Sequence, residues 1–206
     1  MSLVLQSSGG GQITIQEPTT ASNFTQTLPA ATGNVILDTA TQTLTNKTIE
    51  GGTVISGTSV ASTSGTSIDF TSIPSWVKRI TLLMNQVSTN GSSVFRLQLG
   101  TSSGVTTSGY YGNVVDSGGT TRGTYTDGFS LALYGNASYT FNGTIFIQNI
   151  SSNVWMVMGT IGPSAADAGG TVCGGISLAA TLDRVRLTTV NGTDTFDNGN
   201  VNILYE

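Results

Sequence analysis

The chain has 206 residues, of which 27 are glycine, none is histidine and only 9% are charged, with a formal net charge of −4 at pH 7. This length fits one ordinary domain with an appendage, and no cluster of bases provides the positive surface that nucleic acids require. Without histidine, a Ser-His-Asp or Cys-His catalytic arrangement and a Cys/His zinc site are excluded.

Residues 1–59 contain apolar side chains only in short, isolated groups such as Ile13 and Ile15, interrupted by Pro18, Pro29 and several glycines. A segment of this kind cannot build a core by itself. We therefore predict an extended N-terminal arm and stem over residues 1–59, whose apolar positions become buried when three copies wind around one axis. A disordered Ser/Thr-rich tail is the alternative that the composition leaves open.

From residue 60 to residue 206 the pattern changes to short strands with alternating apolar positions, separated by turn residues. The predicted strands include Ile80–Asn85, Phe95–Leu99, Leu131–Leu133, Thr144–Gln148, Val154–Met158, Arg184–Thr189 and Val201–Tyr205. Turns are predicted at Asn90-Gly91, Gly118-Gly119, Gly135-Asn136, Asn142-Gly143, Asn191-Gly192 and Asn198-Gly199. The fold class expected for residues 60–206 is all-β, a jelly-roll-like antiparallel β-sandwich.

Cys173 is the chain's one cysteine, so the fold must be held by packing and strand pairing alone. It lies in the glycine-rich segment 169–175, in which we interpret Gly169-Gly170 as a loop, and we expect its thiol to be buried and inert. The start of the sequence has neither a basic nor an apolar signal-peptide region, and no apolar run is long enough to span a bilayer. Export by a signal peptide and membrane insertion are therefore not expected.

Two regions resemble a known group of proteins. Residues 40–53, ATQTLTNKTIEGGT, resemble a stem phrase of fibre and spike proteins of tailed bacteriophages. The segments Ile68–Phe70, Ile73–Ile80, Leu182–Arg186 and Asn202–Glu206 are similar to the terminal domain of phage and prophage tail fibre proteins. The resemblance implies a homotrimer at the virion surface, assembled in the host cytoplasm, that serves in host attachment or as a head-decoration knob.

Phage fibre proteins can also be glycan hydrolases, which work with paired carboxylates. The carboxylates available in the second part of the chain are Asp116, Asp127, Asp167, Asp183, Asp194 and Asp197. Most stand beside glycine, asparagine or threonine, where aspartate is favoured for its local hydrogen bonds in turns. The segment 194–200 also has the oxygen spacing of a calcium loop, but a hairpin turn explains the same residues. We expect neither an enzyme nor a cofactor or metal.

A ligand site, if the chain has one, is best placed in the glycine-rich stretch that holds Tyr110, Tyr111, Arg122, Tyr125 and Asp127. Aromatic faces and planar polar groups are what sugar rings require, so we predict weak binding of a host cell-surface glycan there. The alternative is that these tyrosines cap an edge of the sandwich. Trp76 and Trp155 are interpreted as structural.

Together, these observations predict a homotrimeric fibre or knob that docks on other virion proteins through residues 1–59 and presents the sandwich outward. One alternative function is a capsid-stabilising cement protein. Another is a free carbohydrate-binding module, which would be expected to carry an export signal.

Overall fold

The computed structural model describes residues 2–6, 8–16, 54–123, 126–164 and 169–206. The chain divides into two compact units, residues 1–48 and 49–206. In the first unit, strands β1 (Ser2–Gln6) and β2 (Gln12–Gln16) form an antiparallel hairpin. The remainder of the predicted arm up to residue 53 lies outside the described residues, so the arm stays a prediction.

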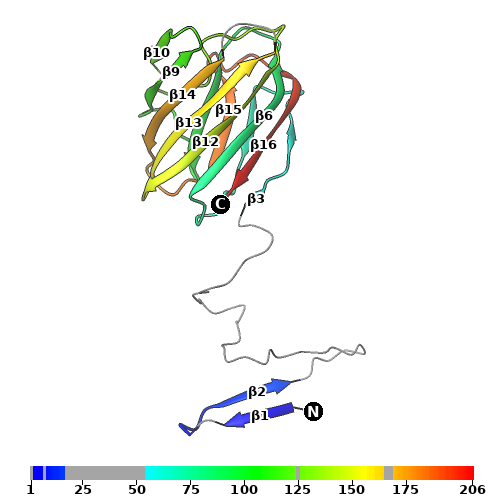
Figure 1. Cartoon of the computed structure of the whole chain (residues 1–206), viewed down its shortest axis with the longest axis vertical. Coiled ribbons are helices and arrows are strands. Elements are labelled where there is room, and N and C mark those ends of the chain that lie inside the picture. Colours follow the sequence, from blue (N-terminus) through cyan, green and yellow to red (C-terminus); the bar gives the residue numbers. More distant parts are fainter. Residues whose placement is uncertain (1, 7, 17–53, 124–125, 165–168) are drawn as a thin grey trace. The chain divides into compact units, whose positions relative to one another are not determined.

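The second unit consists of strands and their connections throughout its described residues, which confirms the all-β expectation (Figure 1). No helix in the described part of the chain is long and apolar enough to cross a membrane. The strands are β3 (Ile55–Ser56), β4 (Val60–Ala61), β5 (Ser67–Phe70), β6 (Arg79–Thr89), β7 (Phe95–Thr101), β8 (Gly104–Val105), β9 (Tyr111–Asp116), β10 (Thr121–Gly123), β11 (Phe129–Ser130), β12 (Phe141–Ser151), β13 (Val154–Pro163), β14 (Gly170–Ser177), β15 (Arg184–Thr189) and β16 (Phe196–Tyr205).

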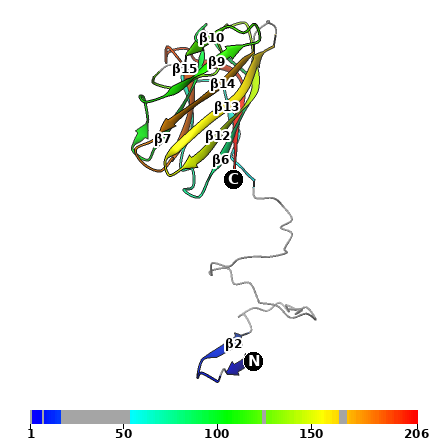
Figure 2. The ribbon, with the colours of Figure 1, turned by 60° about the vertical axis from the view of Figure 1, so that its left-hand side comes forward.

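Two antiparallel sheets form a sandwich (Figure 2). The large sheet has nine strands in the order β10-β9-β14-β13-β12-β6-β16-β3, with β4 also paired to β16. The small sheet has five strands in the order β11-β7-β15-β5, with β8 paired to β7. Strand β3 pairs Ile55 with Tyr205, so the large sheet already includes residues that precede position 60.

The core lies between the sheets because their strands alternate buried and outward-facing side chains. On β12, Ile145 and Ile147 are fully buried, whereas Phe146 between them faces outward. Phe95 of the small sheet meets Phe141 of the large sheet edge to face, with ring centroids 5.2 Å apart. Such contacts join the two sheets through aromatic packing.

Of the predicted loop Gly169-Gly170, Gly170 in fact begins strand β14, which lies between β13 and β9 in the interior of the large sheet. Its glycines are required by close approach, because a Cβ at Gly170 would lie 2.6 Å from the carbonyl oxygen of Leu131. A Cβ at Gly174 would lie 2.9 Å from the ring of Phe129. The sequence signal of a loop was therefore a signal of tight packing.

Three other local predictions were wrong. Leu131–Leu133 is buried but forms no strand, because the strand in this region is β11, which ends at Ser130. The turns predicted at Asn142-Gly143 and Asn198-Gly199 lie within β12 and β16, at positions where the register shifts. Bulges use the same residue types as turns.

Candidate functional site

Tyr110, the first residue of the predicted ligand site, belongs to the core and is only 4% exposed. Its hydroxyl accepts a hydrogen bond from the Leu99 N–H at 2.8 Å, and it lies within 3.0 Å of the carbonyl oxygens of Leu99 and Thr106, to either of which it donates. Burial raises the pKa of this hydroxyl above its ordinary range. Tyr110 therefore fastens the segment before β9 to strand β7.

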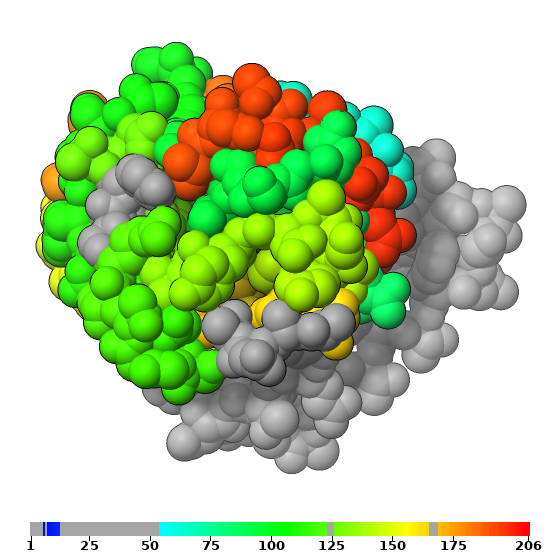
Figure 3. Space-filling view, turned by 90° about the horizontal axis from the view of Figure 1, so that it is seen from above, coloured from blue at the N-terminus to red at the C-terminus, as the bar shows by residue number. Residues whose placement is uncertain are grey.

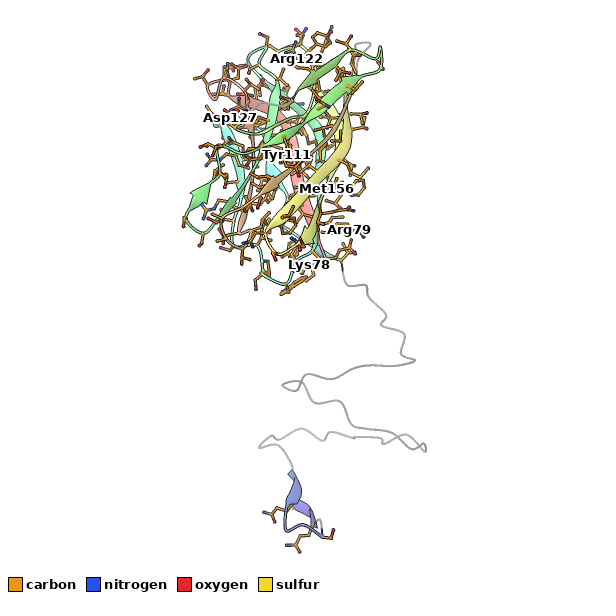
Figure 4. All side chains as sticks on the ribbon, turned by 90° about the vertical axis from the view of Figure 1, so that its left-hand side faces the viewer. Lys78, Arg79, Tyr111, Arg122, Asp127 and Met156 are labelled. Atoms are coloured by element: carbon orange, nitrogen blue, oxygen red, sulfur yellow. The ribbon has the colours of Figure 1, made fainter. Side chains whose placement is uncertain are left out.

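Asp127 and Arg122 have different partners in the fold. Asp127 forms an ion pair at 2.7 Å with Arg96, whose side chain is nearly buried on β7 of the small sheet. Arg122 is exposed on the edge strand β10, where it lies opposite Val114 (Figure 4). This end of the sandwich is formed by the β9–β10 region, in green, together with the orange-red residues near the start of β16 (Figure 3). Tyr125 lies outside the described residues.

Tyr111 is exposed, at 59%. Its side chain lies over Gly175 of the neighbouring strand β14, since a Cβ added at Gly175 would be 2.5 Å from the Tyr111 hydroxyl. Tyr110 and Tyr111 thus face opposite ways, and the structure does not bring Tyr110, Tyr111, Arg122 and Asp127 to one surface. Ligand binding by the exposed members stays a prediction.

Tyr111 belongs to a larger surface, which we call the outer face: the side chains that β9, β14, β13, β12 and β6 direct away from the core. The strand register places one row of them side by side: Asn113, Cys173, Met158, Phe146 and Thr81. The next row consists of Tyr111, Gly175, Met156, Gln148 and Arg79, of which Tyr111, Met156 and Arg79 are labelled in Figure 4.

The outer face is rich in exposed apolar side chains. Met158 is 54% exposed, Met156 is 45% exposed and Phe146 is 39% exposed. Cys173 is exposed in the same row, which corrects the expectation of a buried thiol. It faces outward because Val172, its neighbour on β14, takes the inward position. Apolar side chains grouped in this way mark interaction surfaces more often than single exposed ones do.

Charge is distributed unequally between the two sheets. Strands β12, β13 and β14 contain no Asp, Glu, Lys or Arg, and Arg79 at the margin of the outer face is paired with Glu206. Three ion pairs instead involve strands of the small sheet, and they are Asp69–Arg186, Asp183–Arg184 and Arg96–Asp127. The small sheet therefore carries several charged side chains, whereas the central strands β12, β13 and β14 of the large sheet carry none.

The described residues also line a small cavity of about 220 Å³ at the end of the sandwich near Lys78. Its polar lining comes from Ser75, Ser152, Asn153 and Thr181. The buried indole N–H of Trp155 has no hydrogen-bond partner, but it is sealed from solvent and so cannot serve a ligand in this arrangement. The volume is below the roughly 300–1,000 Å³ of ordinary small-molecule sites.

The segment with calcium-like spacing is explained by its hydrogen bonds. Asp194 accepts hydrogen bonds from the backbone N–H of Ser93 at 2.9 Å and from the side chain of Asn191, and Asp197 bonds to Ser88. Within the described ranges, no group of three or more His, Cys, Asp or Glu side chains could hold a metal ion. Asp194 thus ties the loop before β16 to the loop between β6 and β7, and Asp197 ties β16 to β6.

No protein-family model matches the chain, and neither does any curated protein or solved structure. The functional argument therefore depends on the chain's own residues, and the outer face is the most distinctive surface that they form.

Proposed function

We propose that the chain is a non-catalytic surface protein of a tailed-phage virion. Three copies assemble, residues 1–59 dock on the particle, and the sandwich projects outward to touch host glycans or to decorate the capsid. The resemblance of residues 40–53 and of the strand segments to phage fibre proteins supports this proposal, as does an all-β sandwich whose described carboxylates are occupied by structural bonds.

The observation that carries the proposal is a group of apolar side chains where the chain enters the sandwich, which we call the base cluster. Val54 is 48% exposed, Ile55 is 43% exposed and Trp76 is 51% exposed. Trp76 contacts Tyr205, with ring centroids 5.9 Å apart, and Tyr205 pairs with Ile55. The base cluster thus joins the beginning of the sandwich to its last strand.

A trimeric stem over residues 1–59 would bring three base clusters to one axis. Burying a large apolar side chain completely stabilises a protein by about 1.5–3 kcal/mol, so even partial burial of three side chains in each of three copies favours association. A monomer would leave all of this apolar surface in water. The base cluster therefore favours self-association of the chain.

Weak glycan contacts on a trimer would act together, because three linked sites bind far more strongly than one. Among the predicted ligand residues, Tyr111 offers an exposed aromatic ring. In the attachment version of the proposal, Tyr111→Ala lowers adsorption of particles to host cells and leaves the melting temperature unchanged within about 2 °C. Normal adsorption of a stable Tyr111→Ala particle would favour capsid decoration.

The mass of the full chain in solution tests the assembly. Light scattering is expected to give three times the 21.2 kDa of one chain, and a mass of 21.2 kDa at micromolar concentration would contradict the proposal. A variant that lacks residues 1–53 tests docking, since it keeps every described strand of the sandwich. It should be absent from purified particles, and its incorporation would assign docking to the sandwich.

A further inference from the structure

The outer face has the properties of a buried protein surface, although it lies outside the core of its own chain. Its central side chains are Met158 and Phe146, which lie directly opposite each other on β13 and β12, with Cys173 on the other side of Met158. Neighbouring strands lie about 4.8 Å apart and residues on one face about 6.6 Å apart, so the five strands and two rows cover roughly 24 by 13 Å. Soluble monomers rarely expose apolar patches larger than a few hundred Å².

The distribution of charged residues indicates that another protein surface covers this face, because the centres of protein interfaces are depleted of charged residues. The small sheet of the same sandwich carries three ion pairs, whereas the central strands β12, β13 and β14 carry no charge. If the outer surfaces of both sheets faced water, both would need charged side chains for solubility, and the two sheets would not differ in this way.

The same charges indicate what covers it. In a symmetric assembly, residues close to the axis meet their own copies, so any charge there would face a like charge. A face with an uncharged centre avoids this repulsion. At its margin stand Arg79 and Glu206, which form an ion pair of zero net charge, so identical faces can approach without opposing potentials. A partner of opposite charge would find nothing to recognise.

We propose that the outer faces of three copies of this chain pack against one another around the threefold axis, with Met158 and Phe146 nearest the axis. This inference rests on the homo-oligomer of the proposed function and adds the place where the sandwiches meet. Flexible methionine side chains fill the irregular space between such surfaces.

Met158→Glu tests this interface by placing a charge at its centre. Because the stem and the base clusters also hold the copies together, the variant should dissociate into 21.2 kDa chains at a protein concentration at least ten times higher than the unsubstituted protein does, with an unchanged far-ultraviolet circular dichroism spectrum. The matched control is Thr193→Glu, which adds the same charge to an exposed position in the loop before β16 and should keep the oligomer. Loss of assembly in both variants would overturn the proposal.

Cys173 provides a second measurement, because it is the chain's one thiol and lies beside Met158. In the unsubstituted oligomer, its reaction with Ellman's reagent should be at least ten times slower than in Met158→Glu, and dilution should accelerate it. A thiol that reacts at the free rate in the intact oligomer overturns the interface and leaves the proposed trimer standing, as does a Met158→Glu oligomer that resists dilution as well as the unsubstituted one. A monomeric unsubstituted protein overturns both proposals.

Discussion

The Tyr110 hydroxyl offers a sharp test of the fold, because it connects three backbone groups inside the sandwich. Replacing Tyr110 by Phe keeps the ring, which packs edge to face on Phe129 at 4.9 Å, and removes only the oxygen. The Leu99 N–H then loses its 2.8 Å acceptor in a buried position. An unsatisfied buried donor costs about 1–3 kcal/mol, which corresponds to a drop of roughly 4–8 °C in melting temperature for about 2 kcal/mol.

The pH dependence of this difference makes the prediction specific. Burial raises the pKa of Tyr110 in the folded protein, so the unfolded chain releases its proton first as the pH rises past about 10. The unsubstituted protein therefore loses stability above that pH, by about 1.4 kcal/mol at pH 11, and Tyr110→Phe does not lose this contribution. The stability gap between the two proteins should shrink from about 2 kcal/mol at pH 8 to roughly 0.6 kcal/mol at pH 11.

Urea unfolding followed by tryptophan fluorescence at both pH values measures the gap. The matched control is Tyr111→Phe, which removes a hydroxyl from the exposed neighbouring residue and should change stability by less than about 0.5 kcal/mol at pH 8. The reasoning is refuted if Tyr110→Phe is as stable as the unsubstituted protein at pH 8, or if the gap stays constant up to pH 11.

Three further predictions concern packing, charge and the arm. Gly159→Ala should destabilise the sandwich by about 1–3 kcal/mol, because its Cβ would lie 2.3 Å from a carbonyl oxygen of β12. The control is Gly118→Ala, whose Cβ has room and which should change stability by less than about 0.5 kcal/mol in the same urea titration. Asp127→Ala should lower the free energy of unfolding by about 1–2 kcal/mol, because its partner Arg96 is nearly buried. Asp69→Ala removes a half-exposed ion pair with Arg186 and should lower the free energy of unfolding by less than about 1 kcal/mol. Equal losses in the two variants would contradict the role given to burial. Deleting residues 1–53 should leave a cooperatively folded, strand-rich domain by circular dichroism, and an unfolded product would show that the arm is part of the fold.

The sequence predicted strands best where apolar side chains alternate on a clean two-residue period. Arg184–Thr189 was predicted with the bounds of β15, since Val185 and Leu187 point inward and both arginines point outward. The sequence did not predict strand β14, because a glycine that leaves room for a neighbouring ring or carbonyl oxygen looks the same in the sequence as a glycine that allows a turn. The space around a glycine is a tertiary property.

The candidate site was harder to predict than the fold. Tyr110 and Tyr111 are adjacent and chemically alike, yet one is buried under three backbone contacts and the other lies on the outer face. Which of two neighbours points inward depends on the register of β9 against β14, which local sequence does not determine. The sequence did not predict the outer face for the same reason, since Phe146, Met158 and Cys173 lie on three different strands and become neighbours only through strand pairing.

The position of β16 governs when the sandwich can form during synthesis. This strand lies between β6 on one side and β3 and β4 on the other, yet it is the last of them to leave the ribosome. Until it arrives, β6 has one free edge, and β3 and β4 have no partner among the described strands. Long-range pairing of this kind is slow and leaves strand edges open to other chains. Nascent chains that wait for β16 are therefore the species most prone to aggregate, and slower production at lower temperature should raise the yield of folded protein.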